Sequence, residues 1–246
     1  MSDFGIVGYG IVGKATHTGL LYDMPVKIHD IKLDTKLSDL SQCKFVFFCI
    51  PTEDNETIER LVEEIHALKI LNSSCLCIVR CTVPLGTCER IEKLINDNII
   101  YIPEFLRDRC WELDCVNRPV IIGSNVLLPD WLAREEHVKC SLAEAEVLKM
   151  YSNNLAAARI VFANLFYDIS TAVGADYHKV LDCYLKVAHD QSYLEVSDNL
   201  RAFGGKCLSK DLDFLIESFT KLDIPQTLFT AMQNDNKKWP VTIRQS

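Results

Sequence analysis

The sequence lacks the marks of several protein classes. No apolar run approaches the roughly 20 residues that span a bilayer, and the first residues already have the pattern of a strand, which leaves no room for a signal peptide. The formal charge is −8, and no run of Lys or Arg stands out, which argues against binding to nucleic acid or to an anionic membrane. We therefore expect a cytoplasmic enzyme that contacts neither nucleic acid nor membrane.

The eleven cysteines lack the spacing of metal ligands. None form a CxxC pair, and none stand with histidine at zinc-ligand spacing, so we expect no metal site and, in a reducing compartment, no structural disulfide. Four of them, Cys49, Cys75, Cys77 and Cys81, lie in or beside apolar runs typical of strands. These four are interpreted as small buried hydrophobes.

The first 125 residues alternate between apolar runs and segments with helical spacing. Strands that are apolar on both faces and are separated by helices indicate a parallel sheet covered on two sides, so the fold class is α/β, a Rossmann-like, doubly wound and mostly parallel sheet. The expected strands are 4–7, 26–29, 44–50, 75–79, 99–102 and 119–122, and the expected helices are 11–21, 56–68 and 87–96.

The remainder of the chain favours an all-helical domain with one long central helix. Ser141 and Glu144 have the spacing of a capping box, and the helix they begin would run to Gly174, about 48 Å at 1.5 Å per residue. A helix of this length suggests a link between domains or a subunit interface. The expected divisions are a nucleotide-binding domain at 1–126, a connector with a short helix at 127–140, a helical central and dimerisation domain at 141–235, and a tail at 236–246.

A glycine-rich segment follows the first expected strand directly: Gly8-Tyr9-Gly10-Ile11-Val12-Gly13. GxGxxG is weak evidence alone, but between a strand and a helix it has a mechanism. The first glycine allows a tight turn, the second lets the backbone approach a pyrophosphate, and the third lets helix and strand pack closely. The alternative is a glycine turn in a sheet that binds nothing.

Asp30 ends the second expected strand, 22 positions after Gly8. A carboxylate there accepts hydrogen bonds from ribose hydroxyls and repels a 2′-phosphate. The predicted cofactor is therefore NAD rather than NADP, although nearby Lys32 tempers that preference.

Cys207 differs from the other cysteines in its surroundings. It follows a Gly-Gly pair, has Lys206 and Lys210 as neighbours, and precedes a helix for which Ser209 is the expected cap. A helix N-terminus and nearby cations both favour the thiolate, which can attack an aldehyde and pass through a thioester. A buried structural cysteine is the alternative.

Further motifs resemble, in order along the chain, those of the UDP-glucose/GDP-mannose dehydrogenase family. The resemblance runs from residue 1 to about residue 230. After the glycine-rich segment it rests on Pro51-Thr52, the loop TVPLGT at 82–87, PEFLR at 103–107, the helix 143–164, and FGGKCLSKD at 203–211.

The resemblance implies oxidation of the primary alcohol of a nucleotide-sugar, UDP-glucose or a similar compound, to a carboxylate with two NAD and a covalent thioester. Position by position, it makes Cys207 the nucleophile, Lys149 and Asn153 the oxyanion donors, and Glu104 and Asp211 the groups that move protons. Thr82 would orient a water. The implied NAD site comprises residues 8–13, Asp30, Pro51, Thr52 and Thr82, and the implied substrate site comprises Glu104, Phe105, Leu106, Lys149, Asn153, Phe203 and Gly204.

The chain also departs from the family pattern. The family continues into a third domain that helps to hold the nucleotide, so we expect a short form without it, and Arg80-Cys81 replaces the usual residues before Thr82. Two other hypotheses stay open: a single-step hydroxyacid or alcohol dehydrogenase that uses Lys149 and Asn153, and a non-catalytic NAD-binding relative. A homodimer through the long helix is expected, with the run Ala156-Ala157-Ala158 either at that interface or in an intrachain contact.

Overall fold

The structure, a computed structural model, describes residues 2–107, 109–117, 119–187, 197, 201–221 and 226–240. The chain divides into two compact units, Met1–Lys149 and Met150–Gln245. Helix α5 (Leu142–Ala172) begins in the first unit and continues into the second. No helix in these described ranges is long and apolar enough to cross a membrane.

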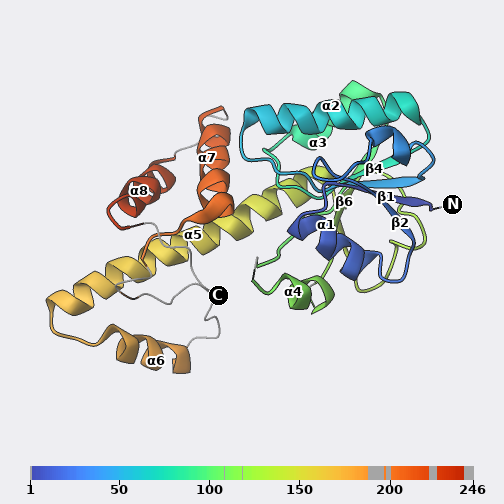
Figure 1. The fold of residues 1–246 in the computed structure, drawn as a ribbon. Coiled ribbons are helices and arrows are strands. Elements are labelled where there is room, and N and C mark those ends of the chain that lie inside the picture. Colours follow the sequence, from blue (N-terminus) through green and yellow to red (C-terminus); the bar gives the residue numbers. More distant parts are fainter. Residues whose placement is uncertain are drawn as a thin grey trace. The chain divides into compact units, whose positions relative to one another are not determined.

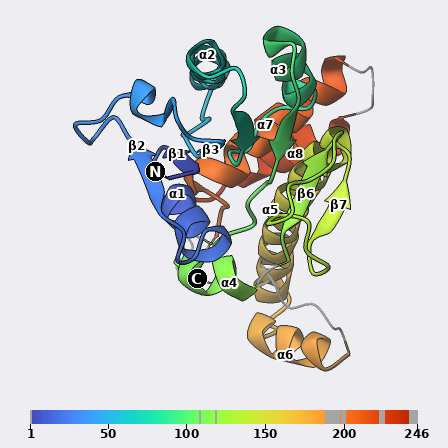
Figure 2. The same cartoon turned by 90° about the vertical axis from the view of Figure 1, so that its right-hand side faces the viewer.

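The first unit contains a seven-stranded sheet of order β2-β1-β3-β4-β5-β6-β7, mostly parallel. Its strands are β1 (Phe4–Val7), β2 (Val26–His29), β3 (Phe45–Phe48), β4 (Leu76–Val79), β5 (Ile99–Tyr101), β6 (Ile121–Ser124) and β7 (Val138–Cys140). The pair β5–β6 is antiparallel, and β6 and β7, side by side in Figure 2, are parallel. The α/β fold class predicted from the sequence is confirmed.

Helices cover both faces of this sheet, as Figure 1 shows. The helical segments are α1 (Ile11–Ala15), which continues as the π-helical η1 (Thr16–Leu20), the 3₁₀ turn η2 (Leu37–Leu40), α2 (Asn55–Leu71), α3 (Thr87–Ile95) and α4 (Trp111–Asn117). The apolar stripe of α2, with Leu61, Ile65 and Leu68 fully buried, packs against one face. Leu21, just after η1, and Leu132 of the connector are buried against the other.

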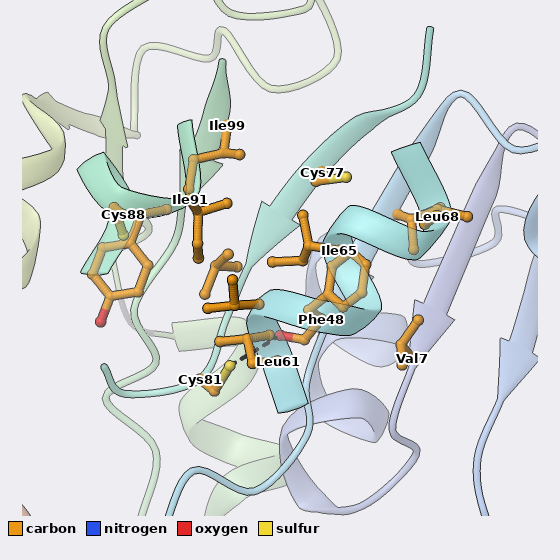
Figure 3. Close-up of a cluster of buried hydrophobic side chains, with 14 of the residues drawn as sticks. Val7, Phe48, Leu61, Ile65, Leu68, Cys77, Cys81, Cys88, Ile91 and Ile99 are labelled. Carbon is orange, nitrogen blue, oxygen red and sulfur yellow. Dashed lines mark hydrogen bonds between the residues drawn. The ribbon is translucent and has the colours of Figure 1, made fainter. Parts of the chain in front are cut away.

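The core between the sheet and α2 and α3 is rich in sulfur (Figure 3). Cys77 and Cys88 are fully buried there among leucine, isoleucine and phenylalanine side chains. The thiol of Cys81 donates a hydrogen bond to the carbonyl of Phe48 at 3.6 Å. Cys49 is also buried, on the opposite face, and burial raises the pKa of its thiol to about 11. The interpretation of Cys49, Cys75, Cys77 and Cys81 as buried hydrophobes is confirmed.

One expectation for the segment after β5 was wrong, and two short elements there were missed. The connector 127–140 contains no helix; instead it makes turns around Trp131 and ends in β7. A strand at 138–140 was missed because its residues, Val-Lys-Cys, are mostly exposed at the edge of the sheet and form no apolar run. The short helix α4 was also missed, since its seven residues expose Leu113 and Val116 and so carry no clear apolar stripe.

The second unit consists of the greater part of α5 together with α6 (Tyr177–Val187), α7 (Gly205–Lys221) and α8 (Thr227–Asn236).

The capping box is present at the start of α5: the amide and hydroxyl of Ser141 both donate to Glu144 Oε2, and the amide of Glu144 donates to Ser141 Oγ. After α5, Gly174 adopts the left-handed φ of +73° expected of a helix stop.

A small core joins α5, α7 and α8 within the second unit. Ala157, Ile160, Phe203, Leu212 and Met232 pack together there. The alanine run at 156–158 therefore lies, through Ala157, in an intrachain contact, which was one of its two open interpretations.

Candidate functional site

The strand order places a topological switch point at the carboxyl edge of the sheet. From β1 the chain passes to β2 on one side and then to β3 on the other, so β1 and β3 flank the point where the winding reverses. Ligands of open α/β sheets bind outside the carboxyl ends of the strands at such a point. The glycine-rich turn after β1 and Pro51-Thr52 after β3 both lie there.

Gly8 makes the turn that leaves β1. It has φ +86°, a left-handed conformation that glycine adopts without strain, and its N–H donates to the carbonyl of His29 at 2.8 Å. A Cβ on this residue would lie 2.8 Å from the carbonyl oxygen of Cys49. Both the turn and the close approach of β3 therefore require glycine.

Gly10 and Gly13 serve opposite purposes. A Cβ on Gly13 would lie 2.1 Å from the carbonyl oxygen of Gly8, so this glycine lets α1 pack directly on the turn. A Cβ on Gly10, the exposed N-cap of α1, would meet nothing within 4 Å. The α1 N-terminus thus faces open space in which an anionic group can approach the backbone amides.

Asp30 lies at the end of β2 with its carboxylate turned toward the glycine-rich turn. Oδ2 accepts a hydrogen bond from the amide of Tyr9 at 2.6 Å, and Oδ1 accepts one from the amide of Lys32 at 2.8 Å. These two amides hold the pKa of the carboxyl below its usual value. The ionised carboxylate retains lone pairs for ribose hydroxyls, so these residues fit a dinucleotide of the NAD type.

The segments after β3 and β4 are hydrogen-bonded to each other at the same edge of the sheet. Thr52, buried, donates its hydroxyl to the carbonyl of Thr82 at 2.6 Å, while Pro51 and Ile11 are exposed. Val12 packs into the core from α1. The structure therefore brings the predicted cofactor residues to one edge of the sheet, with Val12 facing inward from it.

Glu104 and Lys149 form a buried ion pair in the first unit. Lys149 Nζ lies 3.2 Å from Glu104 Oε1 and donates to the Glu104 carbonyl at 2.6 Å. Its ammonium also lies 5.3 Å from the centre of the Phe105 ring, and the amide of Leu106 donates to Glu104 Oε2 at 2.7 Å. Burial opposes ionisation of Glu104, but Lys149, the Leu106 amide and Arg80 overcome it and lower its pKa.

Cys207 and Asp211 lie one turn apart near the start of α7. The helix begins at Gly205 rather than at Ser209, so Cys207 is in its first turn instead of just before it. Cys207 is exposed, whereas Asp211 is fully buried. Asp211 Oδ2 accepts a hydrogen bond from the side-chain Nδ2 of Asn153 on α5, and the Lys210 ammonium lies 3.4 Å from Oδ1.

The side chain of Phe203 is in the core of the second unit. Its backbone is held on both sides by Asn236, whose Oδ1 accepts from the Phe203 amide and whose Nδ2 donates to the Phe203 carbonyl, each at 2.9 Å. Gly204 follows, half-buried. Asn236 was assigned to the tail, and no pattern around it signals this contact, because its partner is 33 positions away.

Sequence reasoning also missed the role of Glu146. Its carboxylate accepts from the amides of Gly86 at 2.6 Å and Cys88 at 2.8 Å, and so caps the N-terminus of α3. Desolvation raises its pKa despite these bonds. The Glu146 carboxylate therefore caps α3, although Glu146 and Lys149 stand three positions apart on α5.

The architecture is an α/β unit with a glycine-rich turn at its switch point, followed by a helical unit. Residues 143–238 match the family model for the UDP-glucose/GDP-mannose dehydrogenase family, central domain. This part of the chain is similar to the central domain of that family, and the resemblance inferred from the motifs is confirmed.

Curated relatives include UDP-glucose 6-dehydrogenases from Streptococcus pneumoniae and Bacillus subtilis. The first is 29% identical over 68% of this chain and 46% of its own length, and the second, TuaD, is 28% identical over 70% and 41%. The match therefore spans about half the length of these relatives.

Solved structures share the fold. A UDP-glucose dehydrogenase from Pyrobaculum islandicum matches 97% of this chain and 68% of its own with a TM-score of 0.79 at 19% identity. A 3-hydroxyisobutyrate dehydrogenase from Mycobacterium tuberculosis matches 97% of this chain and 93% of its own with a TM-score of 0.75 at 13% identity. The fold alone therefore does not separate the dehydrogenases that carry these two names.

Proposed function

We propose that the chain is an NAD-dependent nucleotide-sugar dehydrogenase that oxidises a primary alcohol, C6 of UDP-glucose or of a similar sugar, to a carboxylate. The observation that carries the proposal is Cys207, exposed in the first turn of α7 with the buried carboxylate of Asp211 one turn later. A relative that performed a single oxidation would need no nucleophile at this position.

The first unit would hold NAD through residues 8–13, Asp30, Pro51, Thr52 and Thr82. The open space before Gly10 suits the pyrophosphate, and the carboxylate of Asp30 suits the ribose hydroxyls. Bound NAD would supply the hydride acceptor for both oxidations.

Cys207 would act as the nucleophile on the aldehyde formed by the first oxidation. Its sulfur forms a bond to the carbonyl carbon, the second oxidation converts this adduct to a thioester, and water releases the carboxylate. The position in the first turn favours the thiolate through the helix dipole. Asp211, whose carboxylate is oriented by Asn153, would take the proton in this sequence.

Glu104, Lys149 and Thr82 would serve the same reaction from the first unit. Two cations favour ionised Glu104, which suits a base that activates water. Lys149 and Asn153 are four residues apart on α5, the spacing of two donors on one helical face. Because both already donate to carboxylates, binding an oxyanion requires them to exchange those partners.

We also propose that the chain forms a homodimer through α5. Large apolar side chains of this helix are exposed in the second unit, with the rings of Phe162 and Phe166 stacked 4.5 Å apart. Such a stripe on one helix supports pairing with a second copy. The exposed positions are Tyr151, Leu155, Phe162 and Phe166.

A screen for NADH production tests the proposed function. UDP-glucose, UDP-N-acetylmannosamine, GDP-mannose and small hydroxyacids are supplied with NAD, and the products are identified by mass spectrometry. We expect two NADH per molecule of one nucleotide-sugar and a carboxylate product. Absence of turnover and of binding across the whole panel would instead favour the non-catalytic NAD-binding relative.

A single-step dehydrogenase is the second candidate. It is favoured by the fold shared with the 3-hydroxyisobutyrate dehydrogenase and by the Lys149–Asn153 spacing, neither of which requires a thiol. This candidate predicts one NADH per substrate and an activity that does not depend on Cys207.

A further inference from the structure

Arg80 is a buried arginine that directly follows β4. Its side chain is almost completely removed from solvent, its Nε donates to Thr16 Oγ1 at 3.1 Å, and one terminal nitrogen donates to the carbonyl of Ile102 at 3.1 Å. In the described part of the chain, no carboxylate oxygen lies within 4.0 Å of the guanidinium. A buried cation without such a partner is costly unless an anion lies nearby.

The nearby anion is Glu104. Arg80 and Glu104 line the same cavity of about 40 Å³, enough for a water molecule or two. Glu104 follows β5 as Arg80 follows β4, and these strands are parallel neighbours. The Arg80 guanidinium also holds the Ile102 carbonyl, two residues before Glu104. Arg80 therefore bears on both the position of this segment and the electrostatic potential at the Glu104 carboxylate.

The charged groups around Glu104 come from several elements. Lys149 approaches from α5 and pairs with it directly, Arg80 approaches from the end of β4, and Asp114 and Cys115 of α4 line the cavity. Asp114 is itself neutralised by Arg107, which lies 2.9 Å away. Burial alone would raise the pKa of Glu104. Lys149 and Arg80 act in the opposite direction, and the pKa is lowered on balance.

We propose that Arg80 is a positioning residue for Glu104: its guanidinium fixes the segment after β5 through the Ile102 carbonyl and places a second positive charge at the cavity that Glu104 lines. The importance of this arrangement for turnover rests on the proposed function, in which Glu104 is a base. The electrostatic effect of Arg80 on Glu104 does not rest on the proposed function, and it can be measured without cofactor or substrate.

The test is the titration of Glu104 by NMR in protein labelled with ¹³C at glutamate carboxyls. The E104Q variant identifies the Glu104 signal. R80Q removes the charge but keeps an amide donor for the Ile102 carbonyl, and R80K keeps the charge. R90Q is the matched control, because Arg90 is a surface arginine on α3 that pairs with Glu59.

We expect the Glu104 midpoint to move to higher pH in R80Q, to move less in R80K, and to stay unchanged in R90Q. An R80Q midpoint equal to that of the unmodified protein overturns the proposal, whether or not the protein oxidises any sugar. If the protein is active, the acid limb of kcat/KM shifts in the same direction as the NMR midpoint.

The double variant R80Q/E104Q covers the case in which R80Q does not fold. Recovery of folding in the double variant supports the proposal, because the uncompensated carboxylate is then the cause of the failure. Failure of both variants to fold contradicts it, since Arg80 would then act on the fold without acting through Glu104.

Discussion

Two proposed sites are built in different ways: the nucleotide end of the first unit (residues 8–13 and Asp30) and the thiol end of the second unit (Cys207 and Asp211). The nucleotide end depends on backbone: Gly8 turns the chain at φ +86°, and Gly13 leaves no room for a Cβ. The thiol end depends on side chains placed by one helix start, with Cys207 exposed and Asp211 buried one turn later.

This difference explains what each end tolerates. A site built from backbone loses stability when a methyl group is added at a close-packed glycine, because the neighbouring carbonyl oxygen can move only if its strand moves. When the reactive atom of a side chain is exchanged, the protein keeps its fold and loses only the activity that depends on that atom. Substitutions at the two ends should therefore separate stability, cofactor binding and turnover.

The largest effect is expected at the thiol end. C207S should reduce full oxidation to the carboxylate by at least roughly 1,000-fold, the scale on which loss of a nucleophile acts, while stability and NAD binding stay unchanged. NADH counting and product mass give the measurement, with C183S as control because Cys183 is exposed on α6. Full four-electron turnover by C207S would exclude the thioester route.

The nucleotide end should respond in stability. G13A places a methyl carbon 2.1 Å from the Gly8 carbonyl oxygen and should cost about 2 kcal/mol or more of unfolding free energy in urea. G10A, where the added carbon meets nothing within 4 Å, should keep native stability and weaken NAD binding. Equal stability of the two variants would contradict the backbone account of this end.

A smaller effect on NAD binding is expected from a substitution of Asp30, the side chain at the nucleotide end. D30N removes a charged acceptor but keeps an oxygen for the Tyr9 amide, and should weaken NAD binding by about 10-fold. Calorimetry measures the change, and D34N, an exposed neighbour on the same loop, should leave binding unaltered. Loss of affinity in both variants would point to net charge instead.

The smallest effect concerns stability at acid pH. The pKa of Glu104 is lowered in the folded chain from its ordinary value of 4.5, so its contribution to stability is present above that value and is lost as pH falls through the folded pKa. Unfolding free energy measured against pH should fall less steeply below about pH 4.5 in E104Q than in the unmodified chain. E63Q, an exposed change on α2, should leave the slope unaltered.

Most strands of the first unit could be predicted because apolar residues make up most of each strand and turn residues separate the strands. Val26–His29 and Phe4–Val7 lie at their expected positions. By contrast, β7 is a mostly exposed edge strand with a central lysine, and α4 exposes its large apolar side chains, so neither segment shows an apolar pattern. Their formation depends on neighbours such as β6, with which β7 pairs.

The candidate site was predictable in its residue types but not in all of its partners. The spacing of Gly8 and Gly13 predicts a tight turn and close helix packing, and the structure has both. Lys149 is 45 positions from Glu104, and no local pattern shows that it pairs there. The start of α7 was placed four residues late because Ser209 resembles a cap, although Gly205 begins the helix.

The most direct test of the central claim is to trap the acyl group on sulfur. Protein carrying E104Q, which slows the release of the carboxylate by water, is mixed with NAD and UDP-glucose and quenched in acid, and its peptides are analysed by mass spectrometry. The account predicts a nucleotide-sugar acyl adduct on the peptide that contains Cys207, released by hydroxylamine. Formation of the carboxylate product by the unmodified protein, with an unmodified Cys207 peptide at every time point in both proteins, would contradict it.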